Sequence, residues 1–293
     1  MESPIFVIGS PRSGTTLLRL MLTCHPSIVI PPECGFAVWL YDTHRAWGEG
    51  QEGIERWVAD LMACRKIETW KLDPRRLTAF LVSRGPSSYP EAVSAVYEWY
   101  GREQGRTFTR WGDKNNFHVA HVDTIKAMFP EAFFVHLVRD GRDVACSYRT
   151  LNRRAVDSRY APVLPDGIAQ IAEEWKTNVE SASRAFDAFG RERVIELHYE
   201  DLVSEPESSL RALCRSLGEE YDVRMLDYPE ANRQGELEPG EFLQWKEKTL
   251  QPPTPRERAP HRTELTRDEI ATFEQVGGSV LRRYGYQTSV EAP

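Results

Sequence analysis

The sequence predicts an α/β fold: a parallel β-sheet with helices on both faces, arranged in three layers. Three short, mostly apolar runs carry this prediction, at 4–8, 132–138 and 193–197. A continuous apolar run suits a strand that is buried on both faces. Each run leads into a turn or a helical pattern, and strands that alternate with helices are typical of parallel sheets with right-handed crossovers.

The amino-terminal elements follow in a clear order. The first strand is predicted at 4–8 and ends at a glycine. A turn of small residues comes next. Apolar residues at helical spacing then predict a helix over 15–24, which ends before Pro26. A short second strand is expected at 28–30.

The later elements repeat this pattern. The run 132–138 leads into a helix that opens near Gly141. A long helical pattern covers 168–189, and the strand at 193–197 follows it. A closing helix is predicted over 266–284. Together these elements predict one domain over residues 1–293, a length that a single large α/β domain accommodates.

Two segments differ from the rest in texture. Residues 34–106 look mainly helical and are rich in aromatic residues, so we expect a helical insertion that covers the active site at the carboxyl edge of the sheet. Taken singly, each aromatic fits an ordinary helical core better than a pocket wall. Residues 228–262 contain six prolines and look loop-like, which favours a lid or binding segment. The aromatic residues that we single out in the segment 34–106 are Trp39, Tyr41, Trp47, Trp57, Trp70, Tyr89, Tyr97, Trp99 and Tyr100.

Composition excludes several classes of protein. An aromatic content of 11% argues against disorder, and a net charge of −7 argues against a nucleic-acid partner. The five cysteines have neither zinc nor redox spacing, and His118 and His121 have no companion ligands, so no metal is expected. Because no apolar run reaches about 20 residues and no leader pattern opens the chain, we expect a cytoplasmic protein without a membrane span.

The segment 9–16, Gly-Ser-Pro-Arg-Ser-Gly-Thr-Thr, lies between a predicted strand and a predicted helix. Glycines let backbone N–H groups approach an anion, and the helix N-terminus adds donors and positive potential. The candidate phosphate ligands are Arg12, Ser13, Gly14, Thr15 and Thr16. A nucleotide kinase has lysine where this chain has Thr15, which argues against ATP or GTP and favours a shorter phosphate.

A second basic site is predicted at the end of the 132–138 strand. Arg139 follows that strand directly, where ligands bind in open parallel sheets. Ser147 lies eight residues on, about two helical turns along, and its side chain points back along the helix. Arg139 and Ser147 together can clamp a second phosphate.

The segments 9–16 and 139–147 resemble the two signature motifs of sulfotransferases that use 3′-phosphoadenosine 5′-phosphosulfate (PAPS). The resemblance implies a sulfotransferase fold of the P-loop type. It also implies a 5′-phosphosulfate on the first motif, a 3′-phosphate on Arg139 and Ser147, and adenine near Tyr199 in the similar stretch 198–202. Many cytosolic members have lysine where this chain has arginine in the first motif, so the chain is more similar to the tyrosylprotein, Golgi-type and bacterial branches.

Two further points of this resemblance are less complete. A proline often follows the arginine–aspartate pair of the second motif, where this chain has Gly141. A basic segment that completes the 3′-phosphate site in some branches has only a weak match in 245–248, and Lys248 is its candidate residue.

Sulfuryl transfer requires an activated acceptor, in-line geometry and stabilisation of the leaving oxygen, but no metal. Glu33 is the candidate general base, because in the tyrosylprotein branch a glutamate at the same distance after His-Pro acts as the base. Efficient proton transfer calls for a raised pKa at Glu33. Lys114 resembles the lysine that stabilises charge in the family, with Arg12 beside the reacting group. His118 is the alternative base.

These features predict an enzyme that transfers sulfate from PAPS and releases 3′,5′-adenosine bisphosphate (PAP). The acceptor is a hydroxyl, phenol or amine on a small molecule, glycan or peptide. Two alternatives stay open at this point. One is a P-loop nucleotide or small-molecule kinase. The other is a non-catalytic nucleotide-binding protein of the same fold. The sequence does not indicate the acceptor's identity, the oligomeric state, or whether 228–262 orders on cofactor binding.

Overall fold

The computed structural model describes residues 1–47, 50–154, 156–254 and 259–289. Within them the strands form a parallel five-stranded sheet in the order β2-β3-β1-β4-β5, which confirms the predicted α/β class. Because every pairing is parallel, the carboxyl ends of the strands meet at one edge. The strands are β1 Ile5–Ile8, β2 Ile28–Val29, β3 Arg110–Lys114, β4 Phe133–Val138 and β5 Val194–His198.

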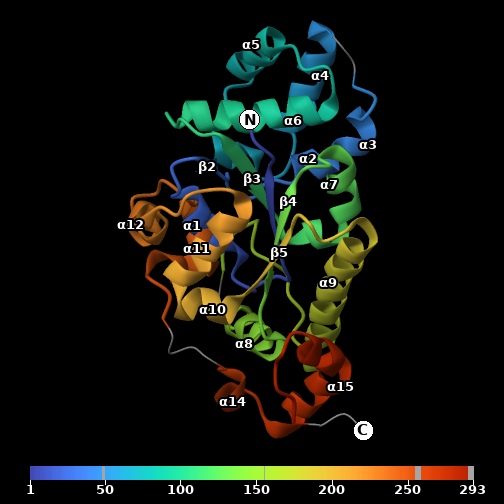
Figure 1. Cartoon of the computed structure of the whole chain (residues 1–293), viewed down its shortest axis with the longest axis vertical. Coiled ribbons are helices and arrows are strands. Elements are labelled where there is room, and N and C mark those ends of the chain that lie inside the picture. Colours follow the sequence, from blue (N-terminus) through green and yellow to red (C-terminus); the bar gives the residue numbers. More distant parts are fainter. Residues whose placement is uncertain (48–49, 155, 255–258, 290–293) are drawn as a thin grey trace.

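Helices cover the sheet on both sides (Figure 1). The α-helices are α1 Thr15–Thr23, α2 Phe36–Trp39, α3 Tyr41–His44, α4 Gln51–Met62, α5 Pro74–Arg84, α6 Tyr89–Glu103, α7 Val122–Met128, α8 Gly141–Asn152, α9 Ile168–Phe189, α10 Tyr199–Ser204, α11 Pro206–Leu217, α12 Tyr228–Arg233, α13 Leu243–Lys246, α14 His261–Glu264 and α15 Arg267–Arg283. The 3₁₀ helices are η1 Ile67–Trp70, η2 Asn116–Ala120, η3 Val223–Leu226, η4 Gly240–Phe242 and η5 Glu247–Leu250.

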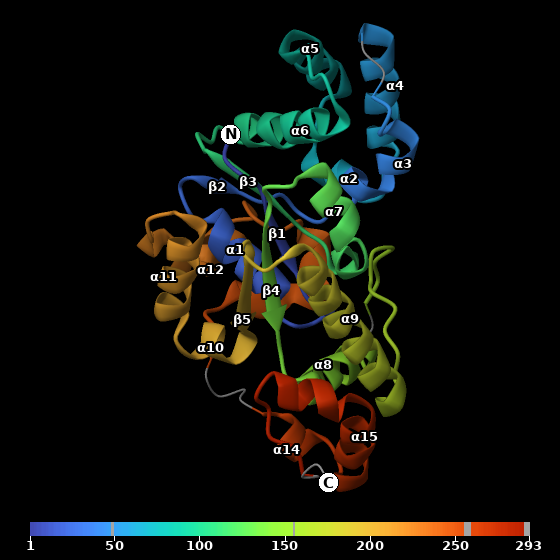
Figure 2. The ribbon, with the colours of Figure 1, turned by 45° about the vertical axis from the view of Figure 1, so that its right-hand side comes forward.

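Alternation along β1 builds the three layers. Ile5 and Val7 belong to a buried cluster with α1 and α11, whereas Phe6 and Ile8 belong to the cluster that includes Phe186 of α9. Successive strand residues point to opposite faces, so one apolar run packs against both helical layers. Figure 2 shows α1 and α11 on one side of the sheet and α9 on the other.

The elements predicted from apolar runs are confirmed, with ends shifted by a residue or two. Strand β3 was not predicted, because three of the five residues in its sequence Arg-Trp-Gly-Asp-Lys are charged. All five residues are nevertheless buried. Arg110 pairs with Glu219 at 2.9 Å, and the hydroxyl of Tyr97 donates to Asp113 at 2.8 Å. Paired charges can occupy a central strand that hydrophobic periodicity does not detect.

The segment 34–106 is helical, as expected, but it covers the site only in part. Helices α4, α5 and α6 lie at the end of the molecule where β1 begins, whereas the carboxyl end of β4 points toward α8 (Figure 2). Most of the aromatic residues pack in the core beside the sheet; Tyr97, for example, stacks on Trp111 with ring centroids 4.1 Å apart. Of the nine aromatics singled out, only Trp39 lines the main cavity. The expectation that these aromatic residues together form a wall of the pocket was therefore wrong.

The segment 228–262 is not loop-like, which corrects that expectation. It holds the short helices α12, η4, α13, η5 and α14, while residues 255–258 lie outside the described part of the chain. Buried polar contacts fasten it. The side-chain amide of Asn232 donates to Thr249 Oγ1 at 2.9 Å, and the hydroxyl of Tyr228 donates to the carbonyl of Gln251 at 2.9 Å. Whether this segment moves when a ligand binds stays a prediction.

None of the helices described has both the length and the apolar character needed to cross a bilayer. The location of the protein in the cell and its organisation as a single domain stay predictions.

Candidate active site

A cavity of about 850 Å³ opens at the carboxyl edge of the sheet. Its walls come from the phosphate loop, the end of β3, α8, the segment 159–164 and the helices α13 and η5. Nine Lys or Arg residues line it against four Asp or Glu residues. The whole chain carries a net charge of −7, so this concentration of positive charge marks a site for an anionic ligand.

The phosphate loop has the backbone of an anion-binding nest. Arg12 has φ 65° and Gly14 has φ 93°, so two residues of this turn are left-handed. Such turns aim successive N–H groups into one concavity. A non-glycine residue at positive φ is uncommon, and strain of this kind gathers at functional sites. Gly14 also caps α1, which brings the helix N-terminus to the same point, as predicted.

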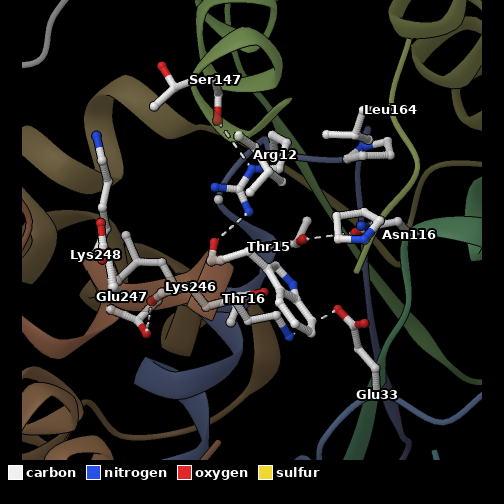
Figure 3. Close-up of a pocket in the computed structure, with 18 of the residues that line it drawn as sticks. Arg12, Thr15, Thr16, Glu33, Asn116, Ser147, Leu164, Lys246, Glu247 and Lys248 are labelled. Carbon is white, nitrogen blue, oxygen red and sulfur yellow. Dashed lines mark hydrogen bonds and ion pairs between the residues drawn. The ribbon is translucent and has the colours of Figure 1, made fainter. Parts of the chain in front are cut away.

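The side chain of Arg12 links this loop to two distant elements. Its Nε donates to Ser147 Oγ at 3.2 Å, and its Nη1 donates to the carbonyl of Trp245 at 3.1 Å (Figure 3). Burial, together with the nearby cation Arg139, lowers the pKa of Arg12 to about 10. The predicted neighbours Arg12, Arg139 and Ser147 therefore meet in one place.

Arg139 completes the basic end of the cavity. Its Nη1 donates to the carbonyl of Arg12 at 3.1 Å, and its guanidinium lies over the ring of Tyr199, 4.4 Å from the centroid. Its Nε is buried and has no hydrogen-bond partner among the described residues. Within the same residues, neither Arg12 nor Arg139 contacts a carboxylate. Two neighbouring guanidinium groups without an anion form a binding site for one.

The remaining predicted ligands separate into two groups. Gly14, Thr15, Thr16 and Lys248 line the cavity, and Thr15 Oγ1 donates to Asn116 Oδ1 at 3.1 Å. Ser13 does not line it. The Oγ of Ser13 is buried and has no partner within the described chain.

Glu33 lies among three ammonium groups. Lys114 donates to Glu33 Oε1, and Lys66 donates to Glu33 Oε2 at 2.7 Å. The Nζ of Lys246 lies 3.6 Å from Glu33 Oε1. Burial raises the pKa of this carboxyl group, but the three cations outweigh burial and hold the pKa well below 4.5. The expectation of a raised pKa was therefore wrong, because no sequence pattern indicated the cations at 66 and 246.

Lys114 points from the end of β3 into the cavity, as its predicted role requires. It is 1% exposed, and burial lowers its pKa from 10.5 to about 8, against the opposing effect of Glu33. The adjacent loop is fixed from behind. Asn115 Nδ2 donates to Asp113 Oδ1 at 2.8 Å and to the carbonyl of Cys34 at 3.3 Å. These bonds hold the chain that carries Glu33 against the end of β3.

His118 is placed differently from the other candidates. It is fully buried, it does not line the cavity, and both ring nitrogens lack a hydrogen-bond partner within the described residues. Its Nε2 lies 3.7 Å from Asp113 Oδ2. Burial lowers its pKa to about 3. The structure therefore argues against His118 as the alternative base. No cluster of three His, Cys, Asp or Glu residues suited to a metal occurs in the described chain.

An apolar wall faces the charged residues of the cavity. Trp39 stacks on Phe117 with centroids 5.4 Å apart and planes 18° apart. Gly35 makes room for this pair, since a Cβ there would lie 2.4 Å from the Phe117 ring. The cavity's further apolar lining includes Ala161, Pro162, Val163 and Leu164. This part of the cavity can therefore accept an apolar or ring-shaped group.

Comparison with known proteins settles the family. The model of the sulfotransferase family matches residues 4–223, which include the phosphate loop, Glu33, Lys114 and Arg139. The chain belongs to the sulfotransferase family.

Among curated relatives of this chain, protein-tyrosine sulfotransferase A of Caenorhabditis elegans is 23% identical over 224 residues, covering 76% of this chain and 52% of that protein. Nodulation protein NoeE of Sinorhizobium fredii is 26% identical over 300 residues, covering 98% of this chain and 66% of that protein. The chain thus spans about half the length of the first of these relatives. The sulfotransferase domain from the curacin biosynthetic pathway has the same fold, with a TM-score of 0.63, 20% identity, and 98% and 99% coverage of the two chains.

Proposed function

We propose that this chain transfers a sulfuryl group from PAPS to a hydroxyl, phenol or amine acceptor. The observation that carries the proposal is the pair of guanidinium groups at Arg12 and Arg139, which lie together beside an anion-binding loop without a carboxylate partner among the described residues. Two such groups suit a ligand with two phosphates. Membership of the sulfotransferase family supports PAPS as that ligand.

The residues present fit this donor. The phosphate loop, with Arg12, Gly14, Thr15 and Thr16, would hold the 5′-phosphosulfate. Arg139, with its buried and unpartnered Nε, would hold the 3′-phosphate together with Ser147. The ring of Tyr199 comes close to the loop because Gly14 has no side chain, since a Cβ there would lie 2.4 Å from the ring. Tyr199 would bound the adenine, and Lys248 would add charge at the cavity wall.

Glu33 is the general base of this proposal. Its carboxylate lines the cavity. Its low pKa keeps it deprotonated at neutral pH, but also makes it a weaker base than a carboxylate with a raised pKa. A new bond joins the acceptor atom to sulfur while the S–O bond to the 5′-phosphate breaks. The bonding electrons leave on the phosphate oxygen, and the acceptor proton passes to Glu33.

Lys114 supplies the compensating charge. Its ammonium is buried at the end of β3 and hydrogen-bonded to Glu33. A preorganised cation in a site with little water stabilises charge that develops on a leaving oxygen, and one such donor is worth about 10²–10³ in rate. Because Lys114 holds Glu33 in place, the base and the charge stabiliser form one unit.

The apolar wall favours an acceptor with a ring or other apolar surface. The exposed Trp39, stacked on Phe117, offers a flat face for such a group. One relative is a protein-tyrosine sulfotransferase, whose name indicates a phenolic acceptor. We therefore rank phenols ahead of aliphatic alcohols and amines.

A turnover assay tests the proposal. The protein is incubated with PAPS and with phenol, alcohol and amine acceptors in parallel, and PAP release and sulfated product are both measured. Acceptor-dependent release of PAP in equal amounts to sulfated product is the expected result. Turnover of ATP–Mg²⁺ with no release of PAP would overturn the proposal in favour of a kinase.

A further inference from the structure

A row of alternating charges runs from α1 to the candidate base. Arg19 of α1 pairs with Glu238, and Glu238 also accepts a hydrogen bond from Lys246. The Nζ of Lys246 lies 3.6 Å from Glu33 Oε1. The order of charges is therefore cation, anion, cation, anion, and it ends at Glu33.

This row is buried along its length. The side chains of Arg19 and Glu238 are 1% and 0% exposed, and that of Lys246 is 7% exposed. Arg19 is fixed further by its Nη1, which donates to the carbonyl of Ile30 at 3.0 Å. Buried charges are costly unless they are paired. Glu238 meets two cations, so the trio of Arg19, Glu238 and Lys246 carries one net positive charge.

Helix α13 places the ammonium group of Lys246 at the site. Trp245 accepts the hydrogen bond from Arg12, and the next residue is Lys246, which lines the cavity. Thr249 Oγ1 donates to the carbonyl of Lys246 at 2.6 Å and anchors the end of this helix. Two consecutive residues thus contact the donor loop and the candidate base.

We propose that Lys246 is a further functional cation of the sulfuryl-transfer site, and that Glu238 with Arg19 positions it. This inference rests on the proposed function. The ammonium of Lys246 adds positive charge next to Glu33 and the reacting groups. Glu238 and Arg19 do not line the cavity and act through Lys246, so they are positioning residues.

The first test needs no ligand. The carboxyl carbon of Glu33 is followed by NMR during a pH titration of the ¹³C-labelled protein. Three cations face this carboxylate: Lys114 from β3, Lys66 before η1 and Lys246 from α13. Lys246→Gln removes one charge but keeps a hydrogen-bond donor for Glu238, and it should move the Glu33 midpoint to higher pH.

Two control variants are titrated in the same way. Lys246→Arg keeps the charge and should leave the midpoint of Glu33 close to that of the wild type. Lys71→Met removes an exposed lysine outside the cavity and should leave it unchanged. A folded Lys246→Gln protein with an unmoved midpoint would overturn the inference.

The second test separates chemistry from binding. Lys246→Gln should lower kcat by about 10²-fold and leave the Kd for PAP unchanged, because PAP lacks the sulfonate that is transferred. Glu238→Gln should also lower kcat, and the double variant should be no slower than Lys246→Gln alone, since groups that act as a unit are not additive. Glu241→Gln, at an exposed carboxylate of η4, is the control that should keep full activity.

Failure of the inference and failure of the proposed function give different results. If Lys246→Gln has the wild-type kcat while the wild type transfers sulfate, the role of Lys246 is wrong and the proposed function stands. A wild type that transfers no sulfate overturns the proposed function, and the proposal for Lys246 as a cation of that reaction falls with it.

Discussion

Arg139 donates from Nη1 to the backbone carbonyl of Arg12 at 3.1 Å, and so joins the two halves of the proposed donor site. The two residues lie 127 positions apart in the chain and follow neighbouring strands, β1 and β4. The parallel pairing of those strands brings both arginines to one edge of the sheet. The fold therefore fixes the distance between the two proposed phosphate sites.

Removal of Arg139 should weaken the binding of PAP far more than the binding of 5′-AMP. We expect Arg139→Ala to raise the Kd for PAP by about 10²-fold, since a hydrogen bond to a charged group is worth about 1.5–3 kcal/mol. Isothermal titration calorimetry measures both ligands. Arg153→Ala, at an exposed arginine just beyond α8 that does not line the cavity, is the control. Equal losses for PAP and 5′-AMP would exclude Arg139 as the 3′-phosphate ligand.

Glu33→Gln should lower kcat by about 10²–10⁴-fold, because no carboxylate is left at this position to accept the proton of the acceptor. The affinity for PAP should not fall, since the change removes a negative charge from among three ammonium groups. Steady-state kinetics and calorimetry measure the two quantities separately. Glu55→Gln, at an exposed carboxylate of α4, should behave like the wild type. Unchanged kcat in Glu33→Gln would remove Glu33 from the role of base.

The pH dependence should follow from the two members of the Glu33–Lys114 pair. Glu33 must be deprotonated, and its pKa is held well below 4.5, so the acid limb of kcat/KM should lie below that value. Lys114 must be protonated, and its pKa is lowered to about 8, so activity should fall as pH rises through about 8. Initial rates across a pH series measure both limbs.

Lys114→Arg provides the control for this profile, because a guanidinium stays charged across the range and should abolish the alkaline limb. If the alkaline limb persists near pH 8 in Lys114→Arg, a group other than Lys114 causes it.

Gly141 occupies a position where no side chain fits. A Cβ at Gly141 would lie 2.5 Å from Phe273 and 2.5 Å from Trp175, whose Nε1 donates to the carbonyl of Arg139. Gly141→Ala should therefore destabilise the fold by about 1–3 kcal/mol. Chemical denaturation measures the loss. Gly240→Ala, where a Cβ meets nothing within 4 Å, should change stability little. Equal stability of the two variants would contradict the packing account.

The sequence predicted which residues of the proposed donor half lie close together, because these residues lie in contiguous motifs. Arg12 and Thr15 sit in one loop, and Arg139 and Ser147 span one strand–helix junction. The acceptor half was predicted incompletely. Lys66 reaches Glu33 from an insertion without a motif, and only the folded chain brings it there.

The buried polar groups explain the other failures. Strand β3 was missed because Arg110 and Asp113 lie buried in paired form, which a hydrophobic pattern does not reveal. The segment 228–262 was taken as a loop because of its prolines, yet Glu238 and Asn232 fasten it from within. Proline at the start of α12 is compatible with a helix, and side-chain pairing over long distances does the rest.

Calorimetric titration of the wild-type protein with PAP, 5′-AMP and ATP–Mg²⁺ tests the central claim most directly. The account predicts one site per chain that binds PAP tightly, 5′-AMP more weakly and ATP–Mg²⁺ weakest, because Arg12 and Arg139 form two separate phosphate sites. Tighter binding of ATP–Mg²⁺ than of PAP would contradict the account.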